Sequence, residues 1–130
     1  MIAIDTNVLV RVITADDPVQ TPVAANLFRQ HTIYLTVTVM LETAWVLQHG
    51  YRLSRERIVT VFRILFGLSN IRLEAAAPMH HAILWYAQGL DFADALHVAL
   101  SSAATEVVTF DQQFARQSAD LTSVPVRHLT

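Results

Sequence analysis

Short β-rich runs alternate with longer helical segments along this chain, and that alternation is the strongest constraint on its fold. The predicted strands are residues 2–4, 33–37, 71–73, 106–110 and 124–128. The predicted helices are residues 18–30, 39–49, 55–67, 78–88, 92–104 and 112–118, with a short helix or extended turn at 8–13. Strands connected through helices pair in parallel, so the order predicts an α/β fold with a mostly parallel sheet of four to five strands.

Small polar residues precede most of the predicted helices, as is typical of helix N-caps. The candidate caps are Asp17 followed by Pro18, Thr36 or Thr38, Ser54, Asp91 and Asp111. Glycines at positions 50, 67 and 89 lie at or near the predicted helix ends. Pro125 marks the last strand as an edge strand, because proline cannot donate a backbone hydrogen bond.

Length and composition indicate a small, unusually apolar domain. The chain has 130 residues, of which 53% are hydrophobic, and its mean hydropathy is +0.38. That length predicts a single domain over residues 1–130, with either an unusually full core or an apolar surface covered by a partner. No stretch reaches the roughly 18–20 apolar residues of a membrane span. Cysteine is absent and the N-terminus does not resemble a signal peptide, so we expect a cytoplasmic protein.

The basic residues exclude several function classes. The net charge is −2, and all nine basic residues are arginines. Without lysine the chain has no Walker A phosphate loop and no Schiff-base nucleophile. The same absence argues against a phosphoacceptor receiver domain. It also argues against a phosphatase with Asp5 as nucleophile, in which we expect a second aspartate where this chain has Asn7.

Asp5 ends the first apolar run. Ile2, Ala3 and Ile4 suit a buried central strand, which needs apolar side chains on both faces. A carboxylate at the C-terminal end of a central parallel strand lies where open α/β sheets bind ligands. The residues around Asp5 leave two interpretations open, a ligand-binding carboxylate or a cap of the next helix.

Three further carboxylates occupy unusual positions. Glu42 lies within the most apolar predicted helix, where we expect it to be poorly solvated. Asp94 falls in the first turn of a nearly apolar helix, and Asp111 directly follows a predicted strand. If these acids and Asp5 meet at one edge of a parallel sheet, they repel one another, and a divalent cation removes the conflict. Oxygen ligands without cysteine favour Mg²⁺ or Mn²⁺, which points to phosphodiester hydrolysis.

These motifs together resemble the PIN-domain ribonucleases. The resemblance rests on Asp-Thr-Asn-Val-Leu at 5–9, Glu42 in an apolar helix, Asp-Phe-Ala-Asp-Ala-Leu at 91–96 and Thr-Phe-Asp at 109–111. Length and composition are similar to those of the small VapC-type toxins of bacterial toxin–antitoxin pairs. The resemblance covers essentially the whole chain. It implies a three-layer α/β/α sandwich and a Mg²⁺- or Mn²⁺-dependent endoribonuclease.

The resemblance also implies roles for individual residues and partners. Asp5, Glu42, Asp94 and Asp111 match the metal-binding, catalytic acids, while Asn7 and Thr109 match polar positions that support the site by hydrogen bonds. The expected partners are an RNA substrate, a cognate antitoxin in the groove beside the acids, and a second copy of the chain. The alternative interpretation is a non-catalytic PIN-like module that binds protein or RNA without cutting.

Other residues near these motifs receive secondary predictions. Asp91 is expected to cap its helix and to support the site. His97 is expected to be a hydrogen-bonded neighbour of the acids or a core group rather than a base. The candidate RNA-binding residues are Arg11, Arg52 and Arg116, with Arg55 and Arg57 as weaker candidates. Trp45 and Trp85 are expected in core or dimer packing rather than in base stacking. The helix that carries Ile58, Phe62, Leu65 and Phe66, beside that with Trp45, is expected to supply partner-binding surface.

Overall fold

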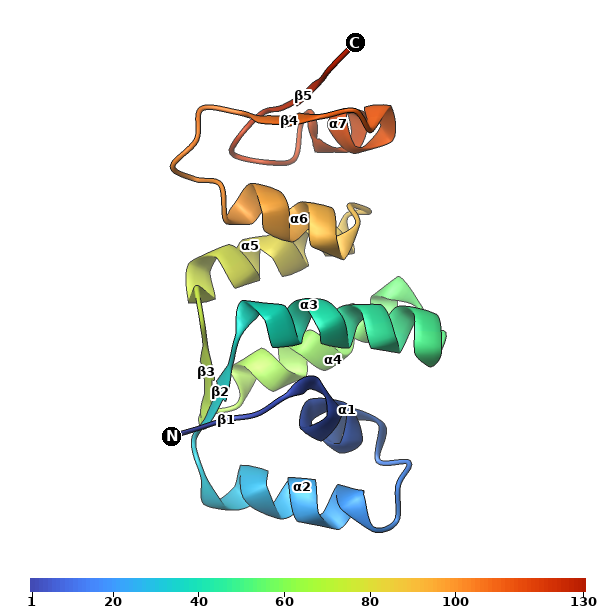
Figure 1. The fold of residues 1–130 in the computed structure, drawn as a ribbon, viewed down its shortest axis with the longest axis vertical. Helices are drawn as coiled ribbons and strands as arrows, with labels where there is room; N and C mark the ends of the chain where they lie inside the picture. Colours follow the sequence, from blue (N-terminus) through green and yellow to red (C-terminus); the bar gives the residue numbers. More distant parts are fainter. The chain divides into compact units, whose positions relative to one another are not determined.

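The computed structural model describes all 130 residues and divides them into two compact units (Figure 1). The first unit is Met1–Glu74 and the second is Ala75–Thr130. The strands pair only in parallel, as predicted, and seven α-helices accompany them. No helix in the chain combines the length and the apolar character needed to cross a membrane.

The first unit is a three-stranded parallel sheet with its helices. Its elements in order are β1 (Ile2–Ala3), α1 (Thr6–Thr14), α2 (Gln20–Gln30), β2 (Ile33–Leu35), α3 (Val37–Trp45), the π-helix η1 (Val46–Gly50), α4 (Arg55–Gly67) and β3 (Ile71–Leu73). The strand order is β1-β2-β3, with Ile2 beside Ile33 and Ile33 beside Ile71. Helix α1 packs against α2 and α3, and α4 packs against β3.

Local capping signals set most of the helix starts in this unit. The Thr36 hydroxyl accepts a hydrogen bond from the Val39 amide, and the Ser54 hydroxyl accepts one from the Arg57 amide, which confirms both predicted caps. Asp17 accepts hydrogen bonds from two backbone amides at the entrance to α2. These caps satisfy amides that have no partner within the helix.

The core of the first unit includes most of the apolar face of α4. On α4, Ile58 and Phe62 are fully buried and Leu65 is 5% exposed. These three side chains therefore pack within the unit, and the expectation that this helix supplies partner-binding surface stays a prediction. The exposed apolar side chain of α4 is instead Ile64, at 64%.

The second unit pairs a helical hairpin with a two-stranded parallel sheet. Its elements are α5 (Ala76–Ala87), α6 (Phe92–Ala99), β4 (Val107–Thr109), α7 (Gln112–Ser118) and β5 (Val126–His128). Helices α5 and α6 pack closely against each other, and α7 packs on β5 and β4. Gly89 follows α5 with φ of 117°, a conformation that glycine adopts without a steric penalty. Helix α6 ends at Ala99, earlier than the predicted 104.

The sheets are smaller than predicted. Five strands are present, but they form one sheet of three strands and one of two, not one sheet of four to five. The strand β1, expected at the centre, pairs only with β2 and forms an edge of its sheet. Each strand is two or three residues long, so few hydrogen bonds connect it to its neighbour. Apolar composition alone therefore did not indicate the position of each strand in a sheet.

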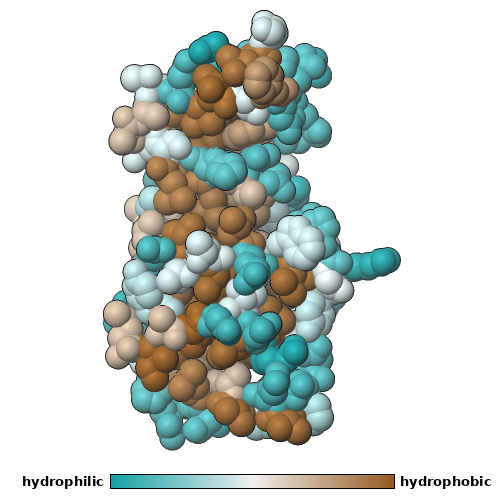
Figure 2. Space-filling model, viewed as in Figure 1, coloured by the Kyte–Doolittle hydropathy of each residue, from teal (hydrophilic) through white to brown (hydrophobic).

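Part of the apolar composition lies at the surface. Figure 2 shows hydrophobic residues interspersed with polar ones on the displayed face. The large apolar side chains that are exposed are Met1, Val19, Val23, Trp45, Ile64, Leu68, Leu84, Leu100, Val108 and Phe110. The high hydropathy therefore reflects both a full core in each unit and an apolar contribution to the surface.

Candidate active site

Asp5 both follows a strand and caps a helix. It lies between β1 and α1, and its Oδ1 accepts a hydrogen bond from the Val8 amide at 3.2 Å. The side chain is exposed, and no other hydrogen bond engages it. The two interpretations left open by the sequence are therefore compatible, because one oxygen serves the cap while the other stays accessible to a ligand.

Glu42 reaches the same place from α3. The hydroxyl of Thr6, the residue next to Asp5, donates a hydrogen bond to Glu42 Oε1. Thr6 is only 6% exposed, so this donor is fixed by its packing. The hydrogen bond joins residues 36 positions apart and holds Glu42 close to the start of α1.

The expected poor solvation of Glu42 is wrong, because Glu42 is exposed. On α3 the buried side chains are Met40, Thr43 and Ala44, and Glu42 lies on the other side of the helix. Thr6 was not among the predicted site residues, although a hydroxyl directly after Asp5, in the first turn of a helix, is a usable signal.

A third carboxylate at this sheet edge has a structural role. Glu74 follows β3, and its Oε1 accepts a hydrogen bond from the Val37 amide at 2.8 Å. The Glu74 amide in turn donates to the Leu35 carbonyl at 2.9 Å. Glu74 therefore supplies a hydrogen-bond acceptor for a backbone amide at the start of α3, the helix that carries Glu42, and connects this helix to the sheet.

A groove of about 390 Å³ opens beside Asp5. Its walls come from α1 and α2 and comprise Asp5, Asn7, Val8, Arg11, Val19, Gln20, Val23, Ala24 and Leu27. Arg11, which was predicted to bind RNA, already has intramolecular partners here. Its Nε donates a hydrogen bond to Gln20 Oε1 at 2.8 Å, and its Nη1 lies 3.5 Å from Asp16 Oδ1. Asn7 is exposed in the groove and remains available to a ligand.

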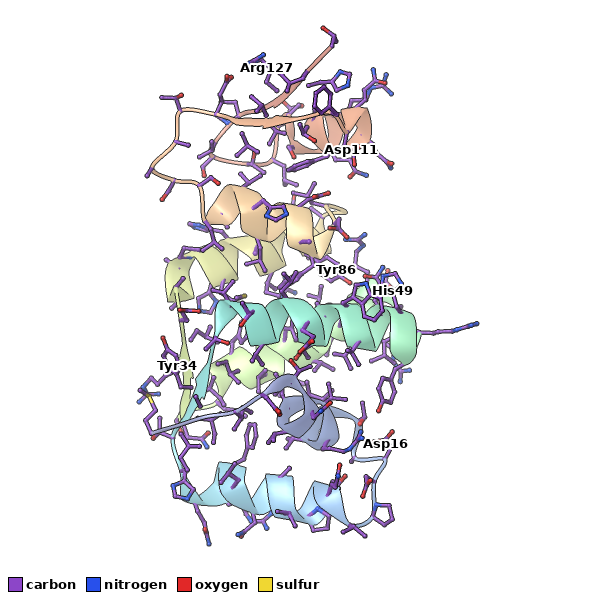
Figure 3. The ribbon with its side chains drawn as sticks, viewed as in Figure 1. Asp16, Tyr34, His49, Tyr86, Asp111 and Arg127 are labelled. Atoms are coloured by element: carbon purple, nitrogen blue, oxygen red, sulfur yellow. The ribbon has the colours of Figure 1, made fainter.

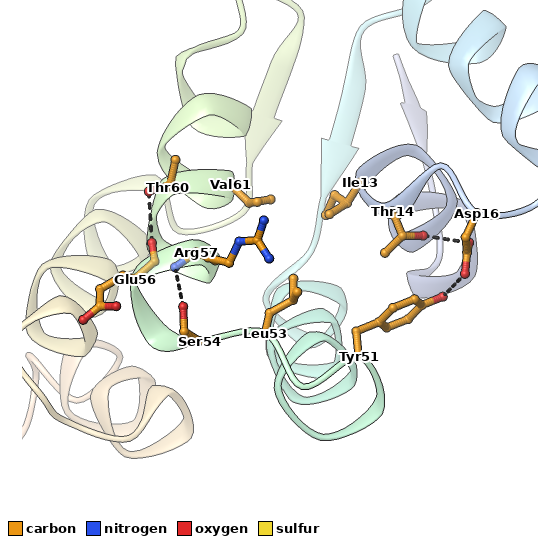
Figure 4. Close-up of a pocket in the computed structure, with 10 residues that line it drawn as sticks. All are labelled: Ile13, Thr14, Asp16, Tyr51, Leu53, Ser54, Glu56, Arg57, Thr60 and Val61. Carbon is orange, nitrogen blue, oxygen red and sulfur yellow. Dashed lines mark hydrogen bonds between the residues drawn. The ribbon is translucent and has the colours of Figure 1, made fainter.

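A larger cavity of about 560 Å³ lies between α1 and α4 (Figure 4), and neither Asp5 nor Glu42 lines it. Its lining residues are Ile13, Thr14, Asp16, Tyr51, Leu53, Ser54, Glu56, Arg57, Thr60 and Val61. At one end, hydrogen bonds from the Thr14 and Tyr51 hydroxyls hold the pKa of Asp16 below its ordinary value. These bonds tie the end of α1 to the segment after η1, so we assign Asp16 a structural role.

The second unit carries the other candidate acids. Asp91 caps α6 by accepting a hydrogen bond from the Asp94 amide at 3.1 Å, as predicted. Asp111 caps α7 by accepting one from the Phe114 amide at 3.1 Å (Figure 3). The Thr109 hydroxyl accepts a hydrogen bond from the Asp111 amide at 2.9 Å, which fixes the backbone of this acid.

Asp94 is electrostatically strained. Partial burial raises its pKa, and the negative charges of Asp91 and Asp111 raise it further. The exposed His97 on the last turn of α6 acts in the opposite direction. A nearby cation would stabilise the charged form of this carboxyl group, because it compensates for both the lost hydration and the repulsion from the neighbouring carboxylates.

The residues present fit a divalent cation in the chemistry of their donors. Each unit supplies carboxylate oxygens that are only partly used by backbone amides, and no thiolate is available. Such donors suit a hard ion such as Mg²⁺ or Mn²⁺. In neither unit, however, do three or more acidic or histidine side chains form a group arranged to hold a metal ion.

The remaining candidate residues fall into two groups. Arg52 and Arg116 are exposed, and their guanidinium groups make no hydrogen bond or ion pair, while Arg57 lines the larger cavity. Trp85 is 5% exposed and belongs to the core, as predicted, whereas Trp45 is 62% exposed. Trp45, which lies on the same side of α3 as Glu42, is therefore not a core residue, and its expected role in dimer packing stays a prediction.

Comparison with known proteins provides the family. The model of the PIN domain matches residues 2–119, a range that begins in the first unit and extends through most of the second. No curated protein and no solved structure matches the chain. PIN domains are generally nucleases, and such nucleases typically use divalent metals such as Mg²⁺. With the match covering nearly the whole sequence, the chain belongs to the PIN-domain family.

Proposed function

We propose that this protein is a metal-dependent endoribonuclease that uses Asp5, Glu42, Asp94 and Asp111 to cleave RNA. The observation that carries the proposal is the Thr6 hydrogen bond, which holds Glu42 beside Asp5 at the carboxyl edge of a parallel sheet in a PIN-domain chain. A purely structural role does not account for this pair, since Asp5 needs only one oxygen for its cap and Glu42 is exposed.

The protein groups have distinct tasks in this proposal. A bound Mg²⁺ or Mn²⁺ supplies an activated water and offsets negative charge on the phosphoryl group. Asp5 offers the carboxylate oxygen that its cap leaves unused, and Thr6 keeps the Glu42 carboxylate oriented. Asp94 contributes a carboxylate whose charged form a nearby cation would stabilise. The Thr109 hydroxyl fixes the backbone at Asp111.

Binding of the RNA backbone requires cationic contacts to its phosphates. Arg52 and Arg116 are exposed and free of intramolecular partners, so they are the best candidates for phosphate binding. Arg11 stays a candidate only if RNA displaces its contacts with Gln20 and Asp16, which lowers its expected contribution. Asn7 and Asp91 are proposed to support the site through hydrogen bonds.

The biological setting that we propose is a VapC-type toxin, acting as a single catalytic domain in the cytoplasm. In this setting a cognate antitoxin silences the enzyme and the toxin forms a homodimer. Expression of the wild-type chain in a bacterium should arrest growth, and expression of Asp5→Asn should not. Arrest by both forms would contradict a toxin activity that depends on the acids.

The direct test of the nuclease is cleavage of mixed RNA. We expect cleavage with Mg²⁺ or Mn²⁺, none with a chelator, and none by Asp5→Asn or Asp94→Asn. Cleavage that survives chelation or either substitution would contradict the roles proposed for the metal and the acids. Failure to cleave any RNA would favour the alternative, a PIN-like module that binds without cutting.

A binding measurement complements the cleavage assay. A cation that binds only the folded chain raises its stability by about 2.7 kcal/mol at a hundred times its dissociation constant. Wild-type protein should therefore melt at a higher temperature with Mn²⁺, and Asp94→Asn should show a smaller increase. An equal increase in both proteins would place the cation elsewhere.

A further inference from the structure

The exposed Trp45 is unusual enough to require an explanation. Its side chain is 62% exposed, although indole is among the largest apolar groups and normally buries most of its surface. The ring contacts the His49 imidazole, with centroids 4.9 Å apart and planes tilted by 38°. Trp45 ends α3. His49 lies in η1, near the end of the same continuous helical stretch (Figure 3).

The surroundings of this ring pair do not resemble the centre of a protein interface. Along α3 and η1 the exposed residues are Thr38, Glu42, Trp45, Gln48, His49 and Gly50. Trp45 is the one large apolar side chain among them, whereas interface centres gather several apolar or aromatic groups. A single flat ring surrounded by polar groups matches a nucleobase, which has an aromatic face and a polar edge.

The position of the ring pair relative to the candidate acids favours the same ligand. Trp45 follows Glu42 by three residues, so the two side chains lie on one helix face, about 5–6 Å apart at their Cβ atoms. Glu42 is in turn held by Thr6 next to Asp5. A base stacked on Trp45 would thus bring its own sugar and phosphate close to this pair of acids.

We propose that Trp45 and His49 form a stacking platform for one unpaired base of the RNA substrate. This inference rests on the proposed nuclease function, because it assigns the substrate a single-stranded region beside the cleavage site. Trp45 supplies the stacking surface, and His49 supports the indole and offers a ring N–H to the base or phosphate. Stacking of this kind is tolerant of sequence, since every base has an aromatic face.

The test separates binding from cleavage by working in the presence of chelator. Binding of a short fluorescent oligoadenylate is compared with binding of an abasic strand of equal length. Loss of one stacked base weakens binding on the order of tenfold. We therefore expect Trp45→Ala to lose about that much affinity for oligoadenylate and little for the abasic strand, while Trp45→Phe retains most of the affinity.

Ile64→Ala is the matched control. Ile64 is 64% exposed and belongs to the same unit, so its substitution removes a comparable exposed apolar side chain. It should leave binding of both strands unchanged. The far-UV circular dichroism and melting temperature of Trp45→Ala should stay close to wild type, because an exposed side chain contributes little to the core.

Several outcomes would overturn the stacking platform. They are equal losses on both strands, unchanged binding by Trp45→Ala, and no binding of oligoadenylate by the wild-type chain. A change from dimer to monomer in Trp45→Ala would instead assign this face to contacts between copies. Failure of the nuclease proposal looks different: wild-type protein would cleave nothing with Mn²⁺, yet still prefer oligoadenylate to the abasic strand.

Discussion

Asp5 is predicted to serve helix stability and catalysis through different properties of the same side chain. The cap needs an oxygen that accepts the Val8 amide, and asparagine provides one as well as aspartate does. The proposed catalytic role needs a negative charge, which asparagine lacks. Asp5→Asn should therefore preserve folding and abolish cleavage, whereas Asp5→Ala should impair both.

The size of the stability effect can be estimated from the cap. Replacing an N-cap by alanine costs roughly 0.5–2 kcal/mol. The Asp5 bond is 3.2 Å long and exposed, which places it in the lower half of that range, at about 0.5–1 kcal/mol. For a chain of this size that corresponds to a fall in melting temperature of roughly 2–5 °C. The loss of a metal-binding charge should lower the cleavage rate by roughly a thousandfold.

Both quantities can be measured on the same three proteins. Thermal melting in chelator reports the cap alone, and RNA cleavage with Mn²⁺ reports the charge. If Asp5→Asn melted as low as Asp5→Ala, the carboxylate charge would matter for folding and the separation of roles would be wrong. If Asp5→Asn still cleaved RNA at the wild-type rate, Asp5 would act only as a helix cap.

Three further predictions follow from the first unit. Thr6→Val removes the hydroxyl that orients Glu42 while keeping the side-chain shape, so cleavage should fall roughly 10- to 100-fold with a small change in melting temperature; an unchanged rate would refute the positioning role. Tyr51→Phe removes a hydrogen bond that lowers the pKa of Asp16. The variant should be less stable than wild type at neutral pH, and the difference should vanish as the pH falls through the folded-state pKa, below the ordinary value of 3.8; a difference that persists at lower pH would contradict this. Ala15→Gly should raise the stability by up to about 1 kcal/mol in denaturant unfolding, because Ala15 adopts φ of 51° at the end of α1; a destabilised variant would show that this conformation carries no strain.

Local chemistry explains what could be predicted from sequence. Thr36, Ser54 and Asp91 were identifiable as caps because a side chain bonds to an amide two or three residues ahead, whatever the rest of the fold does. The strand 71–73 was predicted with the bounds that the structure shows, since Gly67 ends α4 and the polar turn at Ser69 and Asn70 precedes the strand.

Positions that depend on distant partners could not be predicted in the same way. The run at 2–4 is apolar enough for a central strand, yet β1 pairs on one side only. Glu42 and Trp45 lie in an apolar helix, and composition alone suggested burial for both. Which side of that helix faces the core was decided by the packing of Met40 and Ala44, so Glu42 and Trp45 face solvent.

The sequence by itself determined the α/β class, most of the helix caps and the match to the PIN-domain family. Those properties depend on neighbours a few residues away or on residue types in order. Tertiary structure alone decided that Thr6 reaches Glu42 across 36 positions and that Arg11 is occupied by Gln20. The reason is physical: long-range hydrogen bonds and exposure depend on how helices pack on a sheet, and local propensity carries no information on that packing.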